Sequence, residues 1–498
     1  MGAGLLLVAL CALALTAGAA EPAAKFDPQP WLDDFAALKA GMEDRYANLA
    51  WFASPAGGVD LPALERQTRK ALAAADSDRE ARRIILDFVA APGDGHFAPQ
   101  PDDPPAGAAH AEPEAVKLNP DDPVTGCAAL GYASKGRIGF SLPFESLPGF
   151  QLQSDGVAKG FRTGILPVRP GVQLGIVRIS EFRETGTIWA CMEGWLTLAK
   201  AHKAIDAQSV QDAAQDQWFR AMSAILHGFA TAKVAAVMVD IGGNGGGDDQ
   251  GDWLPRLFTS RPVHSAHMFV ARSPAVAGFM DEQLADLRKP LPAPSAYAQA
   301  DDAARQAVDG AIAGLEAKKA ALSNHACDMS WVWREQRPWQ PDAPCSRLTD
   351  AGSAAGSRDY LAPHTFATDI AKRLYWAAVA DDYIGAWTGP VYVVTDNHSY
   401  SAAELFASSM QLNHVAKTVG QRTGGDGCGF VTDTPPLVLP HSRMAFRLPN
   451  CVRLRADGSD EVAGVPPELP VLPLKDESPR ARAARAAEVI AGDLAGGR

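Results

Sequence analysis

The amino-acid sequence predicts a multi-domain protein of the α/β (α+β) class. Two long apolar runs, 234–241 and 389–396, have the composition of strands that are buried on both faces of a sheet. Each run leads through a loop of small residues toward a helix, so we expect a site where the carboxyl ends of these strands meet. From about Trp31 to Val89 the apolar residues recur at helical spacing, which predicts a helical N-terminal domain.

The composition is that of a soluble globular protein. Of the 498 residues, 47% are hydrophobic and 21% are charged, which is enough apolar material for two or three packed units. The formal net charge is -12, whereas nucleic acids and anionic membranes are bound by basic surfaces. We therefore expect no nucleic-acid partner.

The first 20 residues have the features of a cleaved secretory signal peptide. An apolar run at 5–15 is followed by small residues at 17–20, and polar sequence begins at Glu21. A membrane anchor is the alternative, but the run is shorter than the roughly 20 residues that cross a bilayer. We expect a periplasmic or secreted protein with no stable membrane span after signal cleavage.

The cysteines fit an oxidising compartment. Six follow the signal peptide, an even number that predicts disulfides. Proximity along the chain favours Cys428 with Cys451 and Cys327 with Cys345, which leaves Cys127 with Cys191, and buried free thiols are the alternative. The cysteines and histidines lack zinc-ligand spacing, so we expect no metal and no cofactor.

Changes in pattern along the chain suggest a division into segments. We expect, in order, a signal peptide at 1–20, a helical N-terminal domain at 21–95, a loop at 96–135, the first part of the core at 136–272, a partly helical insertion or lid at 273–386, the second part of the core at 387–473 and a tail at 474–498. Within the first part of the core, the patterns predict strands at 137–142 and 172–179 and a helix at 212–232.

The loop at 240–247 contains five glycines, which are normally placed where the main chain approaches something closely. Phosphate binding is one interpretation, but the Lys-Ser/Thr ending of a P-loop is missing, and Asp248 and Asp249 would repel phosphate. A second interpretation is a set of backbone N–H donors for an oxyanion. A tight strand-to-helix turn without catalytic function is the third.

The segment Ser401-Ala402-Ala403-Glu404 opens the helix after the second apolar run. It has the S-x-x-E signature of a capping box, and most such serines only cap a helix. A serine in this place can also be a nucleophile, because a helix N-terminus stabilises the negative charge that forms in acyl transfer. Taken alone, His96 and Glu461 would be interpreted as surface loop residues.

Taken in chain order, these motifs resemble those of the C-terminal processing (tail-specific) peptidases and their tricorn relatives. The loop at 240–246 matches the family's D-L-R-x-N-G-G, except that Ile241 and Gly242 replace Leu and Arg. The further matches are S-A-x-E at 401–404, V-G-x-x-T-x-G at 419–425 and E-x-x-G-V-x-P at 461–467. The resemblance implies a crotonase-like ββα peptidase core and a serine endopeptidase that acts on polypeptides.

The departures from the family's motifs indicate which branch applies. Members with a Ser-Lys pair carry the lysine directly after the third motif, where this chain has Asp426. The tricorn-like branch instead uses a histidine in a D-x-H element and a late glutamate, which His96 and Glu461 match. The resemblance thus implies Ser401 as nucleophile, His96 as general base and then acid, and Glu461 as the group that orients and charge-balances the imidazole.

Further expectations follow from the same resemblance. The backbone N–H groups of Ala402 and of Gly245 or Gly246 would form the oxyanion hole. Many relatives carry a PDZ domain, and 103–172 is the segment where a degenerate PDZ-like element would lie. The alternatives are a catalytically silent ligand-binding protein on the same fold, and an esterase or amidase that uses the same triad. The oligomeric state stays open.

Overall fold

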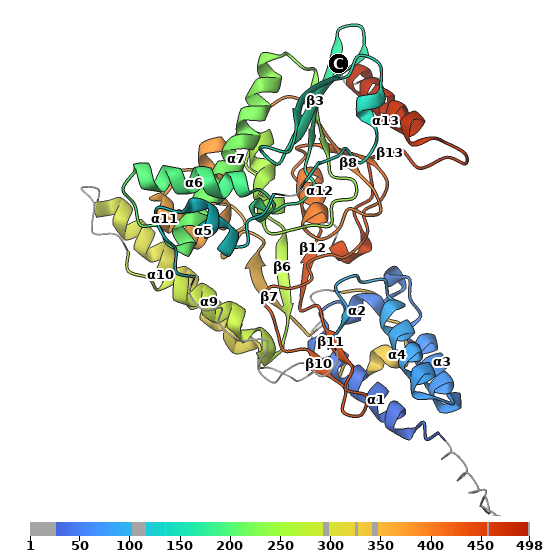
Figure 1. Cartoon of the computed structure of the whole chain (residues 1–498). Coiled ribbons are helices and arrows are strands. Elements are labelled where there is room, and N and C mark those ends of the chain that lie inside the picture. Colours follow the sequence, from blue (N-terminus) through green and yellow to red (C-terminus); the bar gives the residue numbers. More distant parts are fainter. Residues whose placement is uncertain are drawn as a thin grey trace, which may run out of the picture.

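A seven-stranded mixed sheet forms the centre of the protein (Figure 1). The computed structural model describes residues 26–101, 116–134, 136–291, 298–323, 327–340, 347–455 and 458–496. In spatial order the strands are β13 (Leu469–Pro470), β9 (Lys417–Gly420), β8 (Val391–Thr395), β5 (Ala236–Asp240), β4 (Val172–Arg178), β3 (Arg162–Arg169) and β2 (Gln151–Asp155). The sheet and the helices around it confirm the predicted α/β class.

The five strands from β4 to β13 are parallel, and β2 and β3 extend the sheet by antiparallel pairing. Strands β5 and β8 are the two predicted apolar runs, and every residue in them is buried. Alternate side chains of β5 point to opposite faces: Val237 and Val239 pack with α7 (Ala207–Thr231) and α12 (Ala402–Leu412), and Met238 packs with α13 (Pro479–Gly496). Burial on both faces explains their continuous apolar sequence.

Two further sequence predictions are confirmed and one is wrong. The run at 172–179 forms β4, and the predicted helix at 212–232 lies within α7. The run at 137–142 forms no strand. There, the backbone N–H and the hydroxyl of Ser141 donate to the buried carboxylate of Asp240, at 2.7 and 2.5 Å. The Asp240 side chain thus accepts the backbone N–H that a neighbouring strand would otherwise bind.

Two small antiparallel sheets accompany the large one. The first has the order β12-β6-β7 and the second β1-β11-β10. Their bounds are β12 (Cys451–Leu454), β6 (His267–Ala271), β7 (Leu348–Ser353), β1 (Ala98–Gln100), β11 (Ala445–Arg447) and β10 (Leu437–Val438). Strand β1 starts two residues after His96, so its pairing with β11 fixes the chain that carries this histidine to the C-terminal half of the protein.

The N-terminal helices pack on that second small sheet (Figure 1). They are α1 (Gln29–Arg45), α2 (Leu49–Phe52), α3 (Leu61–Ala74) and α4 (Asp78–Ala90). Phe35 and Phe88 pack edge to face, and Phe446 of β11 and Trp333 of the insertion join the same hydrophobic cluster. The buried carboxylate of Asp34 accepts two backbone hydrogen bonds from the turn between β10 and β11. These contacts hold the helices firmly to the rest of the molecule.

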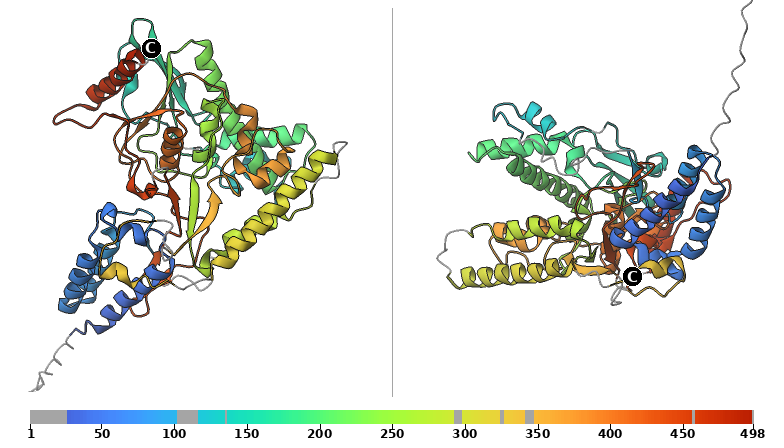
Figure 2. Two further views of the ribbon diagram at one scale, coloured as in Figure 1. Left: turned by 180° about the vertical axis from the view of Figure 1, so that it is seen from behind. Right: turned by 90° about the horizontal axis from the view of Figure 1, so that it is seen from below.

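The remaining helices pack on α7, on α12 or on one another. They are α5 (Pro123–Ala129), α6 (Ile188–Lys200), α8 (Gln250–Trp253), α9 (Ala277–Leu287), α10 (Ala298–Ala321) and α11 (Thr368–Leu374). Helices α9 and α10 run side by side at one edge of the molecule, as both views in Figure 2 show. Helix α10 is the helix expected within the insertion. None of the helices in the described ranges is long and apolar enough to cross a membrane.

Two of the three predicted disulfides are confirmed. Cys127 is bonded to Cys191, which links α5 to α6, and Cys428 is bonded to Cys451 of β12. The third predicted pair involves Cys345, which lies outside the described residues, as does the predicted signal peptide at 1–20. Of the segment expected to hold a PDZ-like element, the described residues form α5, β2 and β3, and both strands belong to the central sheet.

Candidate active site

Ser401 stands at the start of α12 in a strained backbone conformation. Its φ and ψ are 54° and -118°, and the N–H of Ala403 donates to the carbonyl of Tyr400 at 3.0 Å. These values place Ser401 at the second position of a type II′ turn, where glycine is usual. A side chain in this conformation costs about 1 to 3 kcal/mol, and such strain is concentrated at active sites. The turn places Ser401 between the end of β8 and the start of α12.

The glycine loop after β5 lies against this turn. A Cβ atom on Gly246 would lie 2.7 Å from the Cβ of Ser401, so only glycine permits this approach. The N–H of Gly246 donates to the side chain of Asn244 at 2.8 Å. Ala402 is the first residue of α12 and therefore has no carbonyl within the helix to receive its N–H. The two loops predicted from the sequence to form an oxyanion site are thus adjacent.

The buried carboxylate of Glu404 joins the start of α12 to the loop that follows β9. Its oxygen Oε2 accepts the backbone N–H of Ser401 at 3.1 Å and that of Asp426 at 2.7 Å. Its further donors are Thr423 Oγ1 at 2.6 Å, Gly425 N at 2.8 Å and Gly427 N at 3.1 Å. One side chain therefore fixes the nucleophile turn and the 423–427 loop relative to each other.

His96 is held on the other side of the same loop. Its ring nitrogen Nδ1 lies 2.9 Å from the carbonyl oxygen of Asp426, and the N–H of Gly95 donates to the Asp426 carboxylate at 3.0 Å. Because a carbonyl oxygen can only accept, Nδ1 carries a proton, which makes Nε2 the ring nitrogen that can exchange one. The ring also packs edge-on against Phe430, with centroids 5.8 Å apart.

Asp94 is the first residue of the D-x-H element that contains His96. Its buried carboxylate accepts the backbone N–H of His96 at 3.0 Å and, from the connection between α1 and α2, the Tyr46 hydroxyl at 2.8 Å and the Asn48 amide at 3.0 Å. Burial raises the pKa of Asp94, and its hydrogen bonds and His96 oppose this shift. The helical N-terminal region thereby fixes the position of the histidine.

Glu461 is buried close to the same loop, and its contacts differ from those expected. Its carboxylate accepts a hydrogen bond from Arg453 Nε at 2.6 Å, and the same guanidinium donates to the carbonyl of Gly427 at 3.0 Å. The hydrogen bond to Nδ1 of His96, which the sequence interpretation assigned to Glu461, is made by the backbone of Asp426 in this structure. Glu461 thus lies close to the 423–427 loop but forms no hydrogen bond with the His96 ring.

Several carboxyl groups around these loops have raised pKa values. Burial raises the pKa of Asp460 to about 8, and Glu461 and Asp94 add to the shift. Burial and the charge of Glu461 raise the pKa of Glu404 to about 7 against the effect of its hydrogen bonds. Burial also raises the pKa of Asp426, which His96 opposes. Burial therefore favours the neutral forms of these carboxyl groups, and for Asp94 and Asp426 the charge of His96 opposes this effect.

Three of these groups have the residue types of a metal site. Donor atoms of Asp94, His96 and Asp426 lie within 4.8 Å of one another. However, each side chain already makes hydrogen bonds within the protein, to Tyr46 and Asn48 for Asp94, to a carbonyl for His96 and to Gly95 for Asp426. These contacts explain the cluster as a network that positions the histidine.

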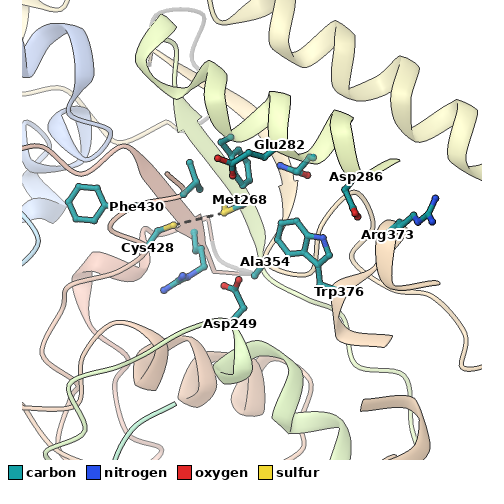
Figure 3. A pocket seen from close by; sticks show the side chains of 13 residues that line it. Asp249, Met268, Glu282, Asp286, Ala354, Arg373, Trp376, Cys428 and Phe430 are labelled. Atoms are coloured by element: carbon teal, nitrogen blue, oxygen red, sulfur yellow. Dashed lines mark hydrogen bonds between the residues drawn. The ribbon is translucent and has the colours of Figure 1, made fainter. Parts of the chain in front are cut away.

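A cavity of about 370 Å³ adjoins the site (Figure 3). Phe430, whose ring contacts His96, lines one side of it, and Asp249, which follows the glycine loop, lines another. Met268 of β6, Glu282 of α9 and Trp376 of the 3₁₀ helix η7 (Trp376–Tyr383) form further parts of its wall. The motifs in the sequence carried no signal for this cavity, because its walls come from seven separate segments of the chain.

Part of the chain matches a known family of peptidases. Residues 304–471 match the family model of peptidase family S41. No curated protein matches the sequence.

Among solved structures, mature CPAF is 14% identical with a TM-score of 0.52, covering 94% of this chain and 98% of its own. Its complex with lactacystin gives the same identity and TM-score, with 95% and 99% covered. The photosystem II D1 C-terminal processing protease is 12% identical with a TM-score of 0.30, covering 91% and 99%. The likeness to CPAF establishes the fold, and together with the family match it supports a serine peptidase, which is a hydrolase.

Proposed function

We propose that this chain is an exported serine endopeptidase that cleaves polypeptides through an acyl-enzyme on Ser401, with His96 as its base. One observation carries the proposal. A single oxygen of Glu404 binds the N–H groups of both Ser401 and Asp426, and the carbonyl of Asp426 holds Nδ1 of His96. The strained serine and the oriented histidine are therefore parts of one hydrogen-bonded unit.

The hydrogen-bonding pattern suits general base catalysis. With its Nδ1 proton engaged by the Asp426 carbonyl, the His96 ring has Nε2 available to take the Ser401 proton as the oxygen attacks a peptide carbonyl. The imidazolium then returns this proton to the leaving amine, and water repeats the sequence to release the acyl group. The negative charges of Asp94 and Asp426 stabilise the imidazolium at this stage.

The oxyanion of the tetrahedral intermediate requires N–H donors close to Ser401. We assign the N–H of Ala402 and that of Gly245 to this role. Gly246 is the less suitable of the two glycines, because its N–H is already donated to Asn244. The close approach of Gly246 to Ser401 supports the assignment, since it brings the loop to the nucleophile.

Glu461 remains our candidate for the third member of the triad, in a charge-balancing role. Its carboxylate and the carbonyl of Gly427 share the guanidinium of Arg453, and Gly427 directly follows the residue that holds His96. In this arrangement Glu461 acts through the loop and its charge rather than through a direct hydrogen bond to the ring.

Two disulfides support export. Cys127–Cys191 and Cys428–Cys451 are both formed within the described residues, and structural disulfides persist in oxidising compartments. We therefore propose a periplasmic or secreted location. Recovery of the protein from the periplasm or medium, with residues 1–20 removed, tests this point.

Hydrolysis assays separate a peptidase from the alternatives. Purified protein should degrade casein, and Ser401→Ala should abolish this activity. Ser409→Ala is a matched control, because Ser409 lies in the same helix and its buried hydroxyl has no hydrogen-bond partner among the described residues. Cleavage of p-nitrophenyl acetate without cleavage of casein would identify an esterase, and inactivity toward both substrates would favour a silent binding protein.

A further inference from the structure

The cavity shown in Figure 3 is lined by residues that neighbour both halves of the proposed catalytic apparatus. On one side, Phe430 separates it from the His96 ring. On another side, Asp249 immediately precedes α8, and the backbone of Gly251 in α8 lies so close to the carbonyl of Ala402 that no Cβ atom would fit. A substrate residue bound beside Ser401 would therefore place its side chain near this cavity.

The wall of the cavity combines apolar surface with unpaired negative charge. Met268 and Trp376 supply apolar surface. The carboxylates of Asp249 and Glu282 form no hydrogen bond or ion pair with any residue in the described part of the chain. In Figure 3 the Asp249 carboxylate points toward Met268 from below, and Glu282 lies above it.

Of the two arginines in the wall, one is paired with a carboxylate. Arg453 is buried and paired with Glu461 at 2.6 Å. Arg373 donates to the backbone carbonyls of Lys289 and Pro290. The third acid in the wall, Asp286, is paired with Lys289 at 2.6 Å. Arg373 therefore keeps its charge, but two carboxylates in the wall, those of Asp249 and Glu282, lack an ionic partner in the ranges that the structure describes, so the net formal charge of the wall is negative.

We propose that this cavity binds the side chain of a lysine or arginine next to the scissile bond, with Asp249 as the main determinant of specificity. The inference rests on the proposed peptidase function and names its substrate class. The long apolar stem of a basic side chain would pack on Met268 and Trp376, and its cationic end would meet Asp249. A cavity of about 370 Å³ has room for such a side chain.

The electrostatics of Asp249 agree with this proposal. Desolvation at the cavity wall raises the pKa of Asp249, which the charge of Arg453 opposes and those of Asp252 and Asp248 increase. A cation that binds beside such a carboxyl group lowers its pKa and favours its ionised form. The proposal also gives the 273–386 insertion a role, because α9 and η7 supply Glu282 and Trp376.

Kinetics on matched peptides test the assignment. Peptides that differ only in Lys, Arg, Leu or Glu before the cleaved bond would be compared. We expect the basic peptides to have the highest kcat/KM. Asp249→Asn should lower their kcat/KM by about tenfold or more and leave that of the leucine peptide nearly unchanged. The matched control is Asp248→Asn, whose carboxylate is exposed and paired with Arg183 at 2.9 Å, and it should retain the preference.

The possible outcomes separate this inference from the function on which it rests. Hydrolysis with equal preference for all four peptides, or a preference that survives Asp249→Asn, would overturn the inference and leave the peptidase intact. A preference for the glutamate peptide would overturn it as well, because it would indicate a pocket governed by Arg453. If no peptide is cleaved, anisotropy of a labelled lysine peptide decides: binding that Asp249→Asn abolishes upholds the pocket, and absence of binding overturns it.

Discussion

The carbonyl oxygen of Asp426 lies 2.9 Å from Nδ1 of His96 and fixes which ring nitrogen carries the proton. In serine triads a carboxylate usually occupies this place. A backbone carbonyl holds the same tautomer but adds no full charge beside the ring. The charge that stabilises the imidazolium must therefore come from neighbouring carboxylates, of which Asp94 and Asp426 are in direct electrostatic contact with His96.

His96→Ala should lower kcat by about 100-fold or more, the usual contribution of a general base. KM should change little, because the ring binds a proton and not the substrate. Thermal stability should change little as well, since the half-buried ring makes one side-chain hydrogen bond. Steady-state kinetics together with a melting curve provide the test. His398→Ala, an exposed histidine on the loop before Ser401, is the control, and near-native kcat in His96→Ala would contradict the assignment.

Ser401→Gly should be inactive and yet more stable than Ser401→Ala. Glycine adopts the φ of 54° without the penalty that a Cβ atom imposes, so about 1 kcal/mol or more of strain should be relieved relative to alanine, less the greater entropy of glycine in the unfolded chain. Denaturant unfolding of the two inactive variants measures the difference. A glycine variant less stable than the alanine variant would show that the backbone at Ser401 is not strained.

Loss of the Cys428–Cys451 disulfide should reduce activity as well as stability. This bond ties the loop after Gly427 to β12, which also carries Arg453. The double variant Cys428→Ala/Cys451→Ala should lose about 2 to 4 kcal/mol of stability and a large part of kcat.

Removing Cys127–Cys191 is the matched control, because this bond links α5 to α6, and neither helix contributes a residue to the proposed site. That double variant should lose stability and keep its kcat. Equal losses of kcat in both variants would argue against a specific role for the bond at the site.

Stability should fall as the pH rises from about 4 to 8. The pKa of Asp460 is raised from 3.8 to about 8 in the folded protein, so over this range the folded state keeps a proton that the unfolded chain has released. Rising pH therefore favours unfolding, and Glu404, with its pKa raised to about 7, acts in the same direction. Asp460→Asn should raise the melting temperature at pH 8 and have much less effect at pH 4.5. Asp433→Asn, an exposed control, should show no such dependence.

The sequence predicted the parts of this site that local patterns encode. The apolar runs of β5 and β8 identify the buried strands, and the S-x-x-E signature identifies Ser401 as the start of a helix. These features depend on neighbours in sequence. The positive φ of Ser401 has no such signal, because its turn is imposed by the glycine loop that packs against it from another strand.

Contacts between distant segments could not be predicted from the sequence. The pairing of Glu461 with Arg453 depends on the position of β12, and a carbonyl partner for His96 has no side chain by which to recognise it. The strand expected at 137–142 does not form for a similar reason, because the carboxylate of Asp240 accepts the backbone N–H of Ser141. In each case the contact depends on how distant segments pack together, and the local sequence is compatible with several such contacts.

The measurement that tests the central claim most directly is active-site labelling of the native chain with a fluorophosphonate, followed by mass-spectrometric mapping of the modified residue. The account predicts one adduct, on Ser401, with its formation slowed strongly in His96→Ala and unaffected in Ser409→Ala. No adduct on folded protein, an adduct on another serine, or equally fast labelling of Ser401 without His96 would contradict it.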